Sequence, residues 1–149
     1  MAPQKQASSE SPRQQRILVT SGRAPVALEF ARAFHRAGHT VFAADCVRNP
    51  RVSASRCIQA YFRTPPARQQ PREFVRFLRE VITENAIDLI VSSCEGVFYL
   101  ARYREELEET GCRIFCDNFD KLAYLHHKAS IMEMARDCGV YLPTTEILS

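Results

Sequence analysis

Three short segments place chemically capable side chains directly after apolar runs of the sequence. They are Ser21-Gly22-Arg23, Asp45 and Cys94-Glu95-Gly96. In an open parallel sheet, ligands bind outside the carboxyl ends of the strands, where loops and helix N-termini meet. These segments are therefore the candidates for cofactor binding, thiol chemistry or recognition of a charged substrate.

Gly22 and Asp45 have the spacing of a dinucleotide site. A glycine between a strand and a helix, with an acid about twenty residues later at the end of the next strand, can hold a pyrophosphate and a ribose hydroxyl. This loop has one glycine in place of three, and Arg23, Ala24 and Pro25 stand where the backbone must approach a phosphate. We favour a tight strand-to-helix turn with a solvated strand-end acid. A small NAD(P)-dependent oxidoreductase is the alternative.

Cys94 is a candidate nucleophile. A thiol at a strand end, just before a helix, gains from the positive field of the helix N-terminus, which favours the thiolate. A cysteine hydrolase also needs a histidine base within reach. The downstream histidines, His126 and His127, fall on or beside a predicted helix. We therefore favour a structural or merely exposed thiol, with a cysteine hydrolase as the alternative.

Glu95 has two interpretations. A carboxylate at a helix N-terminus is stabilised by about 0.3–1 kcal/mol, which explains Glu95 as a capping residue alone. The same position faces the crevice at the strand ends, where a carboxylate would receive a substrate ammonium group. The sequence leaves both open, and capping alone is the simpler.

The elements that position these residues alternate between strands and helices. Apolar runs predict strands at 16–20, 39–45, 58–62, 88–92 and 113–116, and helical periodicity predicts helices between Pro25 and Gly38, over 71–85 and over 97–109. Strands that alternate with helices of this length imply right-handed crossovers and a parallel sheet covered on both faces. We expect an α/β fold, a Rossmann-like parallel sheet flanked by helices, over residues 16–117.

The two ends of the chain differ from this pattern. Residues 1–15 are polar and rich in Ser and Gln, without the apolar core of a secretory signal, and predict a disordered tail. Residues 118–149 predict two short helices, at 118–125 and 127–138, and then an extended segment from Val140. A strand with no successor to pair with leads us to expect that more protein follows.

Composition and charge limit the kinds of protein that this chain can be. The chain has 149 residues, 46% of them hydrophobic and 25% charged, which suits one globular domain with a real core. The net charge of +3 is dispersed and forms no basic stripe with aromatics, so we expect no nucleic-acid partner. No apolar run approaches the roughly 18 residues of a membrane helix. The six cysteines include no CxxC pair, which argues against zinc and for free thiols in a cytoplasmic protein.

Several segments follow one another along the chain in an order that is typical of a known family. They are Ile17–Val19 with Thr20-Ser21-Gly22-Arg23-Ala24-Pro25, the segment from Cys94 to Arg102, and His127-Lys128 followed by Gly139-Val140-Tyr141-Leu142-Pro143-Thr144-Thr145. This order resembles the N-terminal pre-ATP-grasp domain of ATP-grasp proteins, the superfamily of biotin carboxylase and carbamoyl-phosphate synthase. The resemblance runs from about Ile17 to Ser149 and includes the first helix of the ATP-grasp domain proper.

The resemblance implies a ligase in which ATP, with magnesium, phosphorylates a carboxylate and an amine-type nucleophile displaces the phosphate. It implies that Lys128 reaches the ATP phosphates and that Arg23 and Glu95 contact a small-molecule carboxylate or amine substrate. His127 stands where the family often has an acid.

The family's other phosphate-gripping lysine, its adenine-contacting strand and its magnesium ligands would lie in a downstream ATP-grasp domain. We therefore expect a substrate-side domain, a fragment or truncated form with no catalytic residue of its own. A non-catalytic binding module is the alternative.

Overall fold

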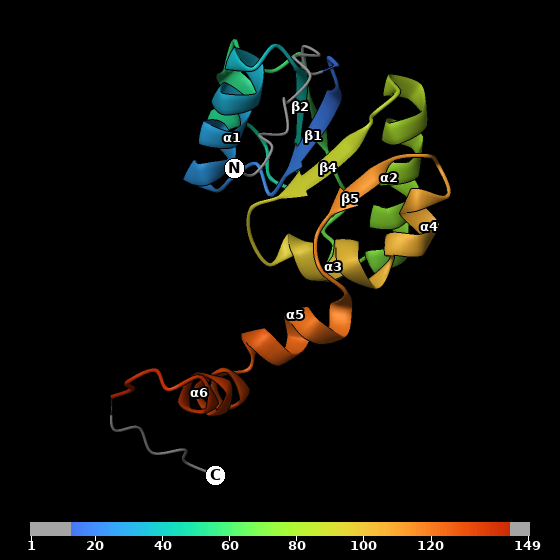
Figure 1. Ribbon diagram of the computed structural model, residues 1–149. Coiled ribbons are helices and arrows are strands. Elements are labelled where there is room, and N and C mark those ends of the chain that lie inside the picture. Colours follow the sequence, from blue (N-terminus) through green and yellow to red (C-terminus); the bar gives the residue numbers. More distant parts are fainter. Residues whose placement is uncertain (1–12, 144–149) are drawn as a thin grey trace, which may run out of the picture.

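A parallel sheet forms the centre of the molecule (Figure 1). The computed structural model describes residues 13–143, and within them the sheet has five strands in the order β3-β2-β1-β4-β5. Its strands are β1 (Arg16–Thr20), β2 (Thr40–Asp45), β3 (Ala60–Arg63), β4 (Leu89–Ser92) and β5 (Arg113–Phe115). Every neighbouring pair is parallel. The expected α/β fold is confirmed.

Helices follow the strands in alternation, as the periodicity predicts. They are α1 (Pro25–Arg36), α2 (Pro71–Asn85), α3 (Gly96–Arg102), α4 (Arg104–Glu108), α5 (Phe119–His126) and α6 (Lys128–Asp137), with a 3-10 turn, η1, at Arg51–Ala54. Pro25 and Pro71 open α1 and α2, where a missing N–H costs no helical hydrogen bond. Gly38, just past α1, takes the left-handed φ of 86° that a chain leaving a helix needs.

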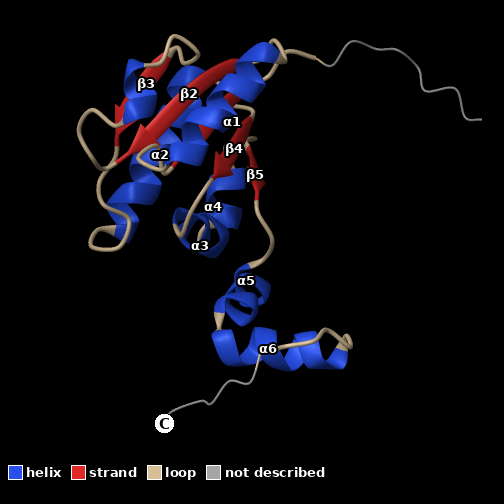
Figure 2. Cartoon of the chain, turned by 90° about the vertical axis from the view of Figure 1, so that its left-hand side faces the viewer, coloured by secondary structure: helices blue, strands red, loops and turns tan. Residues whose placement is uncertain are grey.

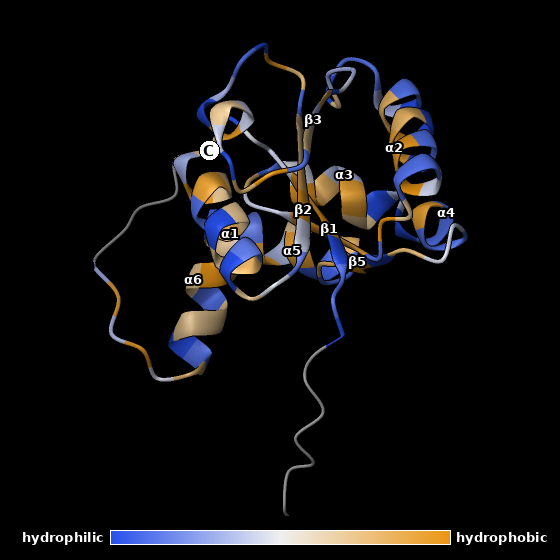
Figure 3. Cartoon of the chain, turned by 90° about the horizontal axis from the view of Figure 1, so that it is seen from above, coloured by the Kyte–Doolittle hydropathy of each residue, from blue (hydrophilic) through white to orange (hydrophobic). Residues whose placement is uncertain are grey.

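The sheet has an apolar core on each face. Successive strand residues point to opposite faces, so Leu18 and Phe42 pack with α2, α3 and α4, whereas Val19 and Val41 pack with α1 and η1. Figure 3 shows α1 on one side of the sheet and α2 with α4 on the other. Because both faces are covered, the edge at the carboxyl ends of the strands is where loops can form a site.

The single helix expected over 97–109 is wrong. The chain leaves helical geometry at Tyr103 (φ −111°, ψ 23°) and forms α3 and α4. Arg104 binds Glu108 across α4 at 3.0 Å, and Glu108 also accepts the backbone N–H of Ile114 in β5. The hydrogen bond from Ile114 attaches α4 to the edge strand β5.

The last two helices lie below the sheet and bury no residue of their own (Figures 1 and 2). The Phe98 ring of α3 meets the His126 ring of α5 at 4.9 Å, and Arg102 lies over the ring of Phe119 at 5.6 Å. Most of the tail predicted over 1–15 and of the extended segment predicted after Val140 lies outside the described residues. None of the described helices has the length and apolar character to span a membrane.

Candidate functional site

A cavity of about 470 Å³ opens at the carboxyl ends of β1, β2 and β4. The strand order reverses between β1 and β4, and such a switch point is where open parallel sheets bind ligands. The volume is in the range of small-molecule pockets. Its lining includes Arg23 and Glu95, which the sequence analysis assigned to the substrate side, together with Asp45 and Cys94.

The sequence offered no signal for the rest of the lining. Thr64, Pro66, Ala67, Arg68 and Gln69 follow β3, in a stretch without periodicity, and reach the cavity only because β3 lies beside β2. Phe74 of α2 and Tyr99 of α3 complete an apolar wall. The cavity therefore combines charged side chains on its rim with a partly apolar interior.

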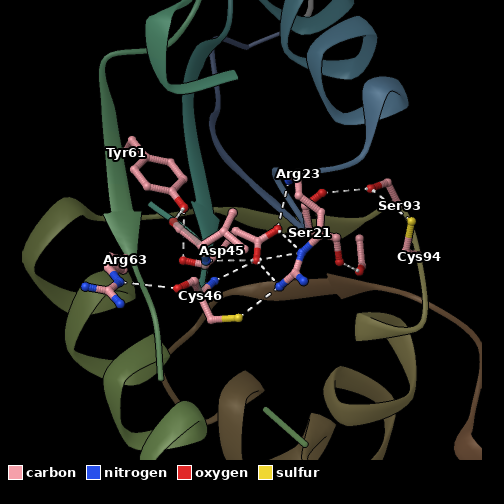
Figure 4. Close-up of polar contacts among 10 residues, drawn as sticks. Ser21, Arg23, Asp45, Cys46, Tyr61, Arg63, Ser93 and Cys94 are labelled. Carbon is pink, nitrogen blue, oxygen red and sulfur yellow. Dashed lines mark hydrogen bonds and ion pairs between the residues drawn. The ribbon is translucent and has the colours of Figure 1, made fainter. Parts of the chain in front are cut away.

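Arg23 and Asp45 form an ion pair at the cavity (Figure 4). The Asp45 side chain is 3% exposed, and its Oδ1 lies 2.5 Å from Nη2 of Arg23. Its Oδ2 accepts the backbone N–H of Arg23 at 2.8 Å, and Oδ1 accepts that of Cys46 at 2.6 Å. The expectation of a solvated acid is thus wrong, because β1 and β2 are adjacent and their loops enclose the carboxylate.

The ion pair sets the charge state of both residues. Burial alone would raise the pKa of Asp45, but hydrogen bonds from the Arg23 side chain and backbone, the charge of Arg23 and the Cys46 N–H together lower it. Hydrogen bonding to Asp45 raises the pKa of Arg23. The Arg23 side chain remains 56% exposed, and its Nη1 has no hydrogen bond within residues 13–143. The N–H groups of Nη1 of Arg23 therefore remain available to a ligand.

The same contacts argue against a dinucleotide site. Both carboxylate oxygens of Asp45 already accept hydrogen bonds from Arg23. A ribose hydroxyl would have to compete with Arg23 for these oxygens. Gly22 gives its N–H to the Ala44 carbonyl at 3.1 Å, and a Cβ there would lie 3.0 Å from Cγ1 of Val52. The glycine serves close packing of the loop on β2, as the favoured tight turn requires.

The loops after β1 and β4 interlock beside the cavity. Ser21 has a left-handed backbone (φ 60°), which costs a residue other than glycine about 1–3 kcal/mol. Its Oγ lies 3.4 Å from Oγ of Ser92, and its carbonyl accepts the hydroxyl of Ser93 at 3.4 Å. A Cβ on Gly96 would lie 2.7 Å from Oγ of Ser21. A side chain at position 96 would thus have to displace the hydroxyl groups of Ser21 and Ser92.

Gly96→Ala is expected to lower the free energy of unfolding by about 1–3 kcal/mol, because the new methyl overpacks a crowded contact. Urea denaturation followed by circular dichroism measures the change. The double variant with Ser21→Ala, which removes the contacting Oγ, should recover part of the loss. An equal loss in the single and double variants would show that this contact is not the cause.

Glu95 stands at the N-cap position of α3, yet its side chain makes no capping hydrogen bond. The residue is exposed and lines the cavity, and it has no ion-pair partner among the described residues. Stabilisation of Glu95 by the positive field of the α3 N-terminus needs no such hydrogen bond, so both interpretations of Glu95 stay open. Glu95 thus lies in the lining of the cavity without an ion-pair partner among the described residues.

Cys94 is exposed on the same rim, with the hydroxyl of Ser93 at 3.9 Å from its sulfur. Within residues 13–143, no histidine hydrogen-bonds to this thiol. His126 packs on Phe98, and Nδ1 of His127 lies 3.2 Å from the hydroxyl of Ser130. The geometry matches the exposed thiol that we favoured over a hydrolase nucleophile.

Lys128 lies apart from this site. It is the first residue of α6, is exposed, and is not among the residues that line the cavity. The structure thus brings Arg23 and Glu95 together but leaves Lys128 elsewhere. Its predicted contact with ATP phosphates stays a prediction.

Thr20 also lines the cavity, although in the sequence it has no feature that distinguishes it from an ordinary strand end. It is 4% exposed, and its Oγ1 has no hydrogen-bond partner among the described residues. A buried hydroxyl without a partner costs about 1–3 kcal/mol.

Thr20→Val is accordingly expected to raise the free energy of unfolding by about 1 kcal/mol, as measured by urea denaturation. The matched control is Thr83→Val, since the Thr83 hydroxyl donates to the Arg79 carbonyl at 2.9 Å and its loss should not stabilise. Destabilisation by Thr20→Val would mean that the Thr20 hydroxyl is hydrogen-bonded in solution.

Comparison with known proteins places the fold. The sequence matches no protein-family model and no curated protein. The L-amino acid ligase of Bacillus licheniformis is similar in structure, with a TM-score of 0.65 and 14% identity over 92% of this chain and 36% of the ligase. The biotin carboxylase domain of a single-chain bacterial carboxylase gives a TM-score of 0.61 and 19% identity, over 87% of this chain and 30% of that one.

A third similar structure is the multifunctional pyruvate carboxylase of Rhizobium etli, with a TM-score of 0.61 and 13% identity, over 89% of this chain and 13% of that enzyme. The chain therefore spans about a third or less of each of these proteins. The chain therefore shares the fold of part of a ligase and of two carboxylases, one of them a biotin carboxylase domain, and this agrees with the fold that the resemblance in its sequence predicted.

Proposed function

We propose that this chain is the N-terminal, substrate-side domain of an ATP-grasp ligase that joins a carboxylate to an amine-type nucleophile. The observation that carries the proposal is the cavity at the switch point, where Arg23 and Glu95 stand on one rim in a domain of this fold. In the proposed reaction, a carboxylate oxygen attacks the γ-phosphorus of ATP and ADP leaves. The amine nitrogen then attacks the carbonyl carbon, phosphate leaves with its oxygen, and the amine proton passes to solvent.

The chain's own part in this reaction is to bind and orient a small molecule. Arg23 offers a fixed positive charge and Glu95 a free negative one. Within residues 13–143, no three or more His, Cys, Asp or Glu side chains are grouped to hold a metal ion. Following the resemblance, our proposal assigns magnesium and most ATP contacts to a downstream ATP-grasp domain.

The division of the chain is part of the proposal. Residues 16–117 form the substrate-side domain, residues 118–149 are a linker and the start of a truncated ATP-grasp domain, and residues 1–15 are a tail. The absence of buried residues in α5 and α6 supports this boundary, because these helices gain little from the sheet. Lys128, exposed on α6, would meet the ATP phosphates only when the rest of that domain is present. We place the whole enzyme in the cytoplasm.

A binding module without catalysis is the second candidate. The observation that favours it is the separation of Lys128 from the cavity, since the described residues then form a binding site without phosphate contacts. The two candidates share the cavity and differ in whether ATP is consumed.

Sequencing past the codon for Ser149 and expressing the resulting product tests the proposal. A longer chain should release ADP from ATP only when a carboxylate and an amine from a substrate panel are both present, and the 149-residue chain should release none. A stop codon after Ser149, in a product that binds small molecules, would favour the binding module. Substrate-dependent ATP turnover by the 149-residue chain itself would overturn the proposed division of labour.

A further inference from the structure

The rim of the cavity carries two opposite charges that nothing in the described residues neutralises. Arg68 follows β3, and Glu95 follows β4; both are exposed and neither forms an ion pair within residues 13–143. Arg23 differs, because Asp45 already compensates its charge while leaving its Nη1 free. The cavity is therefore lined by two guanidinium groups and two carboxylates, of which Arg23 and Asp45 pair with each other while Arg68 and Glu95 form no ion pair within residues 13–143.

The surroundings favour a charged ligand at this cavity. α2 begins at Pro71, close in sequence to Arg68, and a helix N-terminus adds positive potential to that side. Phe74 and Tyr99 line the cavity between the loops, and apolar walls reduce the screening of nearby charges by water. A ligand with one charge alone would leave either Arg68 or Glu95 without a partner.

We propose that this cavity binds a small zwitterion, a molecule with one carboxylate and one ammonium group joined by a short aliphatic chain. The carboxylate meets Arg68 and the free Nη1 of Arg23, and the ammonium group meets Glu95. The aliphatic part lies against Phe74 and Tyr99. This inference rests on the proposed function, since it names the substrate class of the same site.

A series of amino acids with increasing charge separation tests the inference. Glycine, β-alanine, 4-aminobutyrate and 6-aminohexanoate are titrated into the 149-residue chain, and amide shifts are followed by NMR. Butyrate and butylamine serve as half-ligands that keep one charge each. One zwitterion should bind about tenfold or more tightly than either half-ligand, since each charged contact is worth at least that factor. Its shifts should centre on the loops that carry the three charged groups, residues 21–23, 67–69 and 94–97.

Matched variants assign the two charges. Glu95→Gln and Arg68→Gln should each weaken zwitterion binding about tenfold. Glu95→Gln should leave butyrate binding unchanged or stronger, because it removes a repelling charge. Glu80→Gln and Arg76→Gln, exposed on α2 and outside the cavity, should have no effect. All four positions are exposed, so the variants should fold as the parent does.

Two results would overturn the inference. Butyrate binding as tightly as every zwitterion would make the cavity a simple anion site, and no saturable shift at tens of millimolar would leave it without this ligand. Either result leaves the ligase proposal standing, since that proposal is tested by ATP turnover in the longer chain. Conversely, zwitterion binding in a chain that consumes no ATP would support the binding module.

Discussion

Asp45→Ala is expected to lower the free energy of unfolding by about 3 kcal/mol. The Asp45 carboxylate is almost fully buried and accepts hydrogen bonds from the Arg23 side chain and from the backbone of Arg23 and Cys46. Removing one partner of a buried, hydrogen-bonded ion pair costs about 3–5 kcal/mol, and the exposure of Arg23 places this case at the lower end. Urea denaturation near pH 7 measures the loss.

The stabilisation should also depend on pH in a defined direction. The folded-state pKa of Asp45 is lower than its ordinary value of about 4. The unfolded state therefore binds a proton first as the pH falls, and the contribution of Asp45 is complete above about pH 5. It is lost as the pH falls below about 4, through the folded-state pKa. The parent and Asp45→Ala should thus differ least in stability at the acid end of a titration from pH 7 to pH 3.

Arg23→Ala provides the comparison. Asp45 would keep the backbone N–H groups of Arg23 and Cys46, so the single Arg23 variant should cost less than Asp45→Ala. In the Arg23→Ala background, the additional loss from Asp45→Ala should shrink, because the ion pair is already broken. Additive losses, or a cost below about 1 kcal/mol for Asp45→Ala, would contradict this account of the ion pair.

Leu78→Ala is expected to cost about 2–5 kcal/mol, the range for removing a leucine side chain from a packed core. Leu78 is fully buried on α2, among the apolar side chains of the sheet face that α3 and α4 also cover. The matched substitution Leu122→Ala, at a half-buried position of α5, should cost about 1 kcal/mol or less. Thermal and urea denaturation of the two variants measure the difference.

A chain that ends at Asp117 extends this test to both terminal helices. Since neither α5 nor α6 contains a buried residue, its free energy of unfolding should stay within about 1 kcal/mol of the parent's. Loss of cooperative unfolding in the shortened chain would show that residues 118–143 belong to the folding unit of the sheet. Similar costs for Leu78→Ala and Leu122→Ala would lead to the same conclusion.

The sequence predicted the strands and most helices because their signals are local. A short apolar run such as Ile17-Leu18-Val19 is typical of a strand buried on both faces, and apolar spacing such as Phe74 with Leu78 is typical of a helix. The break at Tyr103 has no such signal, because it depends on contacts between α4 and β5 that only the folded chain makes.

The site was predictable in part for the same reason. Arg23 and Glu95 follow apolar runs, so their place at the strand ends follows from the alternation. The pairing of Arg23 with Asp45 requires the knowledge that β1 and β2 are neighbours in the sheet. The contribution of Arg68 requires in addition that the irregular stretch after β3 folds back over the strand ends.

The ion pair between Arg23 and Asp45 also affects how much side-chain conformational entropy Arg23 loses when a ligand binds. An arginine on an open rim ordinarily samples many rotamers, and immobilising such a side chain on binding costs about 0.5–1.5 kcal/mol. Here Asp45 fixes the guanidinium plane before any ligand arrives. The incoming molecule thus meets a preorganised donor, and discrimination at this rim should come from the direction of its hydrogen bonds more than from the attraction of unlike charges.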